Sequence, residues 1–139
     1  MLKCNICELA CEISSRKSGR CGMYIADDGE IVPSYKNQVS AFSIGYIEDV
    51  PIFHFYPGSL TLTLGTVGCN FDCSYCMNSY VVAGSADRTF RHCLNPKELV
   101  EKALRESCRN IAFTLNEPAV SFPFFLELAE LGRDNGMGV

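Results

Sequence analysis

Three cysteines stand close together in the 139-residue chain, in residues 68–76, Gly-Cys-Asn-Phe-Asp-Cys-Ser-Tyr-Cys. Three soft thiolates with the spacing C-x3-C-x2-C suit three irons of one iron–sulfur cluster. A cluster that only transfers electrons normally has four cysteine ligands. Cys69, Cys73 and Cys76 therefore predict a [4Fe-4S] cluster with one iron left open. The alternatives are a zinc site, or a closed cluster that Cys93 completes.

Four further cysteines lie within the first 21 residues: Cys4, Cys7, Cys11 and Cys21. An odd total of nine cysteines, with no secretion signal, speaks against a disulfide framework and favours thiolate metal ligands. Four thiolates can saturate a tetrahedral zinc ion or anchor a second iron–sulfur cluster, and the spacing leaves both open. We expect a metal here, because this stretch has too little apolar periodicity to fold alone. Cys108 lies on an apolar helical stripe and is expected in the core.

The composition excludes several classes of protein. With 47% apolar and 20% charged residues the chain is not disordered, and it lacks the run of about 20 apolar residues that a membrane helix requires. A net charge of -4 gives no reason to expect nucleic-acid binding. The first residues lead into cysteines and charges instead of an apolar signal core, so we expect a cytoplasmic protein.

From about residue 58 the sequence predicts strands and helices in alternation, and these elements must position the cysteine loop. In order we expect a strand at 59–64, a helix at 95–108, a strand at 111–115, a helix at 122–131 and a strand beginning at 137. This order is typical of a parallel α/β sheet, in which functional loops follow the carboxyl ends of strands. Asn116-Glu117-Pro118 follows the second strand, so we expect it to face one pocket with the cysteine loop. Before residue 58, Asp28-Gly29 favours a β-hairpin, and the prolines after it indicate a connecting segment.

The wider string at 68–78, Gly-Cys-Asn-Phe-Asp-Cys-Ser-Tyr-Cys-Met-Asn, resembles the radical S-adenosylmethionine superfamily signature C-x3-C-x-aromatic-C. It is most similar to the pyruvate formate-lyase activating enzymes, and residues 54–59 with the amino-terminal cysteines are similar to the AmmeMemoRadiSam proteins. The resemblance implies that Tyr75 lies near the adenine of S-adenosylmethionine. It also implies that the Asn116-Glu117 loop binds the methionyl ammonium, for which a carboxylate is well suited. The alternatives are loop packing for Tyr75 and a helix cap for Glu117.

The same resemblance implies an oxidoreductase that cleaves S-adenosylmethionine reductively to a 5′-deoxyadenosyl radical, which takes hydrogen from an unknown substrate or activates a partner enzyme. A reductant such as flavodoxin or ferredoxin would supply the electron. The implied fold is a cysteine-rich metal-binding knuckle with a β-hairpin (1–45), then the first two βα units of a partial (β/α) radical SAM barrel (46–139). A full barrel takes about 250 residues, so we expect a fragment, a truncated protein or a complementary chain. The alternative function is a non-catalytic iron–sulfur electron-transfer or zinc-binding module.

Overall fold

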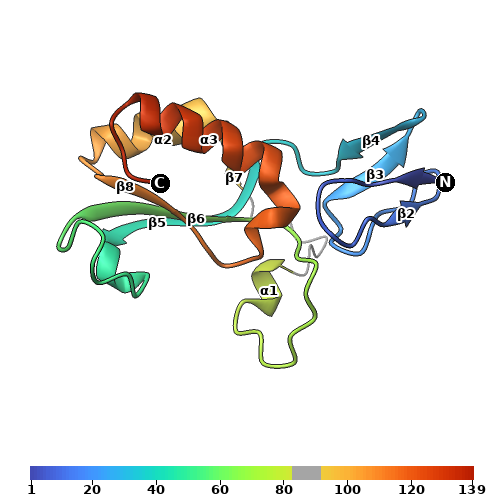
Figure 1. Ribbon diagram of the computed structural model, residues 1–139, viewed down its shortest axis with the longest axis horizontal. Helices are drawn as coiled ribbons and strands as arrows, with labels where there is room; N and C mark the ends of the chain where they lie inside the picture. The colour runs from blue at the N-terminus through green and yellow to red at the C-terminus, as the bar shows by residue number, and fades with distance from the viewer. Residues whose placement is uncertain (83–91) are drawn as a thin grey trace.

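The computed structural model describes residues 1–82 and 92–139. Figure 1 shows an amino-terminal module of short strands beside a larger sheet, which has helices α2 (Pro96–Arg105) and α3 (Phe122–Asp134) on one face. A short helix, α1 (Ser79–Val82), lies at the end of the sheet nearest the module. Within the described residues, no helix has the length and apolar character needed to cross a membrane.

The larger sheet contains the strands that the sequence predicted at 59–64 and 111–115. Its order is β7 (His92–Cys93), β5 (Gln38–Tyr46), β6 (Leu60–Thr66) and β8 (Asn110–Phe113). Strands β6 and β8 are parallel, with Leu62 paired to Ile111. Gly138 forms a parallel bridge with Asn110, which confirms that another strand begins beside β8. The carboxyl ends of β6 and β8 therefore lie next to each other, as the α/β pattern predicted.

Strand β5 corrects the prediction of a connecting segment between the hairpin and residue 58. It runs antiparallel to β6 over its whole length, so the sheet is mixed and begins before residue 46. A bulge between Val39 and Ala41 shifts the alternation, and small polar residues interrupt it at Ser40 and Ser43. The two-residue strand β7 pairs with the start of β5 and was also missed.

The helices begin where the sequence predicted. The Asn95 side chain accepts the Glu98 N–H at 3.0 Å, and the Glu98 carboxylate accepts the Asn95 N–H at 2.8 Å, a complete capping box. Helix α2 ends at Arg105, earlier than expected, because Ser107 has a positive φ of 58°. Cys108 nevertheless packs in the core between sheet and helices, with 6% of its surface exposed, which confirms the predicted core position.

The amino-terminal module consists of two antiparallel hairpins, β1 (Leu2–Lys3) with β2 (Glu12–Ile13) and β3 (Tyr24–Asp27) with β4 (Glu30–Pro33). The second hairpin confirms the prediction at Asp28-Gly29, since both residues have positive φ. The module has its own core, formed by Cys4, Ile13, Met23, Tyr24, Ala26, Val67 and Val120. The last two members belong to the loops that follow β6 and β8. The module is therefore packed against the two loops in which sequence reasoning placed the chemistry.

Candidate functional site

The three loop cysteines line one hollow at the end of β6. The hollow has a volume of about 640 Å³, and Cys69, Cys73 and Cys76 all contribute to its lining. Arg16, Ser18, Arg20, Cys21 and Gly22 of the amino-terminal module also line it. The loop cysteines thus face a shared space that is large enough for a cofactor and that the amino-terminal module helps to enclose.

Backbone hydrogen bonds shape the second half of the cysteine loop. The Cys76 N–H donates to the Cys73 carbonyl at 3.1 Å, and the Ser79 N–H donates to the Cys76 carbonyl at 3.3 Å. The Asn78 side chain then donates to the carbonyl of Leu115, in the loop after β8, at 3.2 Å. The end of the cysteine loop is therefore joined by a hydrogen bond to the loop that follows β8.

Asn116 joins the same two loops at the start of the cysteine loop. Its Oδ1 accepts the Thr66 N–H at 2.9 Å, and its Nδ2 donates to the Thr66 hydroxyl at 2.9 Å and to the Gly68 carbonyl at 2.8 Å. The side chain is 9% exposed, and the Thr66 hydroxyl also bonds Ser121 at 2.6 Å. Asn116 thus fixes the backbone immediately before Cys69. This positioning role was not foreseen, since an isolated Asn-Glu-Pro string carries no signal for it.

Gly68 is held against the amino-terminal module. It has a φ of +82°, and a Cβ at this position would collide with the backbone carbonyl of Cys21. Only glycine satisfies both the conformation and the close approach. The sequence gives no sign of the partner, since Cys21 lies 47 residues earlier in the chain.

Glu117 and Tyr75 are not among the residues that line the hollow. The Glu117 Oε1 accepts the Ala119 N–H at 3.1 Å and caps the short 3-10 helix Pro118–Ser121, the alternative reading of this residue. Within residues 1–82 and 92–139, its other carboxylate oxygen has no partner. Tyr75 is 86% exposed. The Asn116 bonds show that the two loops are adjacent, but none of residues 116–118 lines the hollow. The expectation that both loops face one pocket, and the roles of Glu117 and Tyr75 toward a cofactor, therefore stay predictions.

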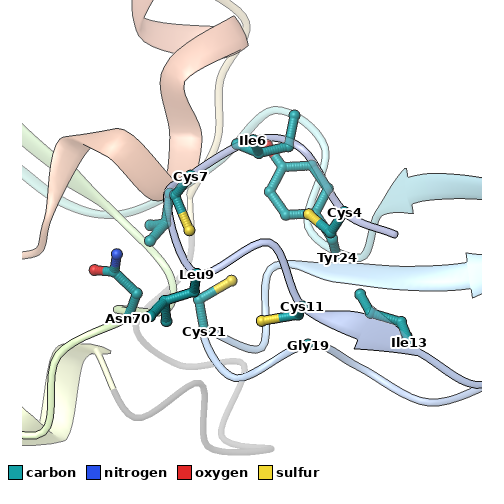
Figure 2. Close-up of a pocket in the computed structure, with 11 residues that line it drawn as sticks. Cys4, Ile6, Cys7, Leu9, Cys11, Ile13, Gly19, Cys21, Tyr24 and Asn70 are labelled. Atoms are coloured by element: carbon teal, nitrogen blue, oxygen red, sulfur yellow. The ribbon is translucent and has the colours of Figure 1, made fainter. Parts of the chain in front are cut away.

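The four amino-terminal cysteines surround a second, smaller cavity. Figure 2 shows the sulfurs of Cys4, Cys7, Cys11 and Cys21 turned toward the same space. The Met23 N–H donates to the Cys21 sulfur at 3.4 Å. Burial raises the pKa of the Cys21 thiol; the Met23 hydrogen bond opposes that change, and the neighbouring cysteines add to it.

The described part of the chain contains no group of three Cys, His, Asp or Glu side chains already set as ligands of one metal ion. The donor chemistry of the large hollow nevertheless suits an iron–sulfur cluster, since three thiolates come from one short loop. Cys21 lines the hollow too, but its sulfur is turned into the smaller cavity (Figure 2). Cys93, the proposed fourth ligand of a closed cluster, is exposed on the edge strand β7 and does not line the hollow.

Comparison with known proteins identifies the family. The model of the Radical SAM superfamily matches residues 63–139, which start within β6 and include the three loop cysteines. The chain belongs to the radical SAM superfamily. An uncharacterized protein of Methanocaldococcus jannaschii is 32% identical over 136 residues, which are 98% of this chain and 41% of that protein. The radical SAM chain thus spans about two-fifths of the length of this curated relative. No solved structure gives a significant match.

Family membership accounts for the order of elements at the site. The match begins at the strand that leads into the cysteine loop and continues through β8 and α3. Radical SAM proteins typically use a [4Fe-4S] cluster with S-adenosylmethionine, which agrees with the three-thiolate donor set. The amino-terminal module lies outside the matched residues, although the relative covers it. Its cysteines therefore require a separate explanation.

Proposed function

We propose that Cys69, Cys73 and Cys76 hold a [4Fe-4S] cluster whose remaining iron binds S-adenosylmethionine, and that the chain is the cluster-binding part of a radical SAM enzyme. The observation that carries the proposal is the shared hollow of about 640 Å³, lined by all three loop cysteines. A closed, four-cysteine cluster would need a further sulfur in this hollow. Cys21 directs its sulfur elsewhere, and Cys93 does not line the hollow.

The chain's own residues contribute position and charge. Asn116 and Gly68 fix the start of the loop, so that the first thiolate sits at a defined point beyond β6. The Glu117 carboxylate oxygen that does not cap Ala119 is proposed to bind the methionyl ammonium, because charge-assisted hydrogen bonds to an ammonium are strong. Tyr75, which is exposed in the cysteine loop after β6, is proposed to pack on the adenine of S-adenosylmethionine.

When bound, the two cofactors supply reductive cleavage of a carbon–sulfur bond and hydrogen-atom abstraction. The electron is proposed to come from a small reductant protein such as flavodoxin or ferredoxin. The resemblance of residues 68–78 to the activating enzymes favours a partner protein as the substrate. The large hollow, which is partly open to solvent, supports access of an external molecule to the loop cysteines.

Anaerobic reconstitution with iron and sulfide tests the proposal. We expect about four irons and four sulfides in the large hollow, lost in Cys73→Ala and retained in the matched control Cys93→Ala. Addition of S-adenosylmethionine to the reduced cluster should change its electron paramagnetic resonance spectrum, because the open iron gains ligands.

Two results would refute the proposal. One is loss of loop iron in Cys93→Ala as complete as in Cys73→Ala, which would indicate a closed cluster. The other is a reduced cluster whose spectrum S-adenosylmethionine leaves unchanged. Zinc without iron or sulfide in the reconstituted protein would equally exclude a cluster and favour a zinc-binding module.

A further inference from the structure

We infer that Cys4, Cys7, Cys11 and Cys21 bind a single zinc ion, as a structural site that is separate from the proposed cluster. All four cysteines line one small cavity (Figure 2). The rest of its lining is Ile6, Leu9, Ile13, Gly19, Tyr24, Asn70 and Val120. The lining supplies four soft sulfur donors in largely apolar surroundings, a donor set that selects zinc or iron–sulfur chemistry and disfavours hard cations.

Two backbone turns bring the cysteines together. The first turn connects β1 to β2 and carries Cys4, Cys7 and Cys11. The Cys4 N–H donates to the Cys11 carbonyl at 2.9 Å, and the Ala10 N–H donates to the Cys7 carbonyl at 3.1 Å. In the second, the Gly22 N–H donates to the Gly19 carbonyl at 3.0 Å, with Cys21 inside the turn. The first turn thus carries three of the four thiols and the second carries the fourth, which completes a set of four thiolates such as structural zinc sites use.

The close packing of the two turns depends on a glycine. A Cβ on Gly19 would lie 3.1 Å from the Ile13 side chain and 3.7 Å from the Cys11 sulfur. The tight contact is the one with Ile13, so the absence of a side chain lets the second turn pack against that residue, while the distance to the sulfur is an ordinary van der Waals contact. The Met23 N–H that donates to the Cys21 sulfur at 3.4 Å would stabilise the thiolate, as backbone donors do for metal ligands.

The size of the cavity distinguishes one ion from a cluster. Its central free volume is about 10 Å³, close to the space of a single water-sized sphere. A single ion held by four thiolates suits a space that admits about one water-sized sphere, whereas a cubane of four irons and four sulfides would require the cysteines to move apart. Four thiolates also complete the coordination of zinc, which leaves no open position and indicates a structural role.

Cys21 connects the four-cysteine cavity to the cysteine loop. Its sulfur faces the small cavity, while its backbone carbonyl packs on Gly68 directly before Cys69. Asn70, from the cysteine loop, lines the small cavity as well. A zinc ion at the four cysteines would therefore hold one wall of the large hollow in place.

Metal analysis of purified and reconstituted protein tests the inference. We expect one zinc per chain, in addition to iron. Cys21→Ala and Cys7→Ala should lose the zinc and keep the loop iron, while Cys69→Ala/Cys73→Ala/Cys76→Ala should lose the iron and keep the zinc. Cys93→Ala serves as the control that keeps both. Failure of the cluster proposal would show in the iron alone, so the two hypotheses are tested separately.

Cobalt substitution keeps the test informative if the cysteine variants fail to fold. One Co²⁺ per chain should bind wild-type protein and give the intense sulfur-to-cobalt charge-transfer and tetrahedral d–d bands of a four-thiolate site. Three outcomes would overturn the inference: about eight irons per chain, loss of loop iron in Cys21→Ala, or no bound zinc or cobalt in protein whose four amino-terminal thiols are reduced.

Discussion

The Asn116 side chain offers a sharp test of how the cysteine loop is held. Asn116→Ala removes the acceptor of the buried Thr66 N–H and the donor to the buried Gly68 carbonyl. Leaving a buried polar group without a partner costs about 1–3 kcal/mol. We therefore expect the free energy of unfolding to fall by about 2–6 kcal/mol. The Thr66 hydroxyl adds little, because it keeps its bond to Ser121.

Urea unfolding followed by circular dichroism measures this change, with Asn135→Ala as a matched control. Asn135 makes one exposed side-chain bond, to the Leu131 carbonyl at 2.9 Å. Its removal should lower the free energy of unfolding by only about 0.5–1 kcal/mol. Asn116→Ala should also retain less iron after reconstitution than Asn135→Ala, since the backbone before Cys69 loses its support.

The refuting result is clear. The reasoning is refuted if the free energies of unfolding of Asn116→Ala and Asn135→Ala differ by less than about 1 kcal/mol, which is comparable to one exposed hydrogen bond. The three hydrogen bonds of Asn116 would then not hold the loop. An unfolding free energy that falls as expected, with iron content unchanged, would keep the structural role but remove the connection to the cluster. Asn116→Asp provides a further check, because it keeps the acceptor for Thr66 but loses the donor to Gly68.

Two other substitutions test the neighbouring contacts. In thermal unfolding, Gly68→Ala should destabilise the chain by about 1 kcal/mol or more beyond Gly29→Ala. Both glycines have a positive φ, but only Gly68 packs on the Cys21 carbonyl. Equal effects of the two substitutions would exclude a role for that contact. Glu117→Gln keeps an acceptor for the Ala119 N–H and removes the charge. Its stability should stay within about 0.5 kcal/mol of wild type while binding of S-adenosylmethionine to the reconstituted protein weakens, as calorimetry would show; unchanged binding would leave Glu117 as a cap alone.

The parts of the fold that sequence reasoning predicted well are those with a strong local signal. Alternating leucines and threonines marked β6, and Asn95 with Glu98 marked the start of α2, because period and capping are properties of adjacent residues. Strand β5 lacked such a signal. Its bulge near Val39 disrupts the alternation, and its partner β6 is fixed by tertiary packing that adjacent residues do not reveal.

The candidate site divides in the same way. The spacing of Cys69, Cys73 and Cys76 could be recognised because all three are on one loop. The contact between Gly68 and Cys21 could not, since it joins segments 47 residues apart and depends on how the module packs on Val67. Nor could the bonds of Asn116, which require β6 and β8 to be parallel neighbours before its side chain can reach Gly68.

These contacts meet at Gly68, which gives the two proposed metal sites a structural connection. The Gly68 carbonyl accepts the Asn116 amide, and its Cα lies against the Cys21 carbonyl. The backbone before Cys69 is thus held both by the loop after β8 and by the amino-terminal module. Because packed contacts of this kind transmit small displacements, loss of metal from the four-cysteine cavity should shift the backbone before Cys69 slightly, while the three loop cysteines and the Asn116 bonds still hold the loop iron. The amino-terminal module is then a support for the cysteine loop, whose backbone it holds through Cys21 and Gly68.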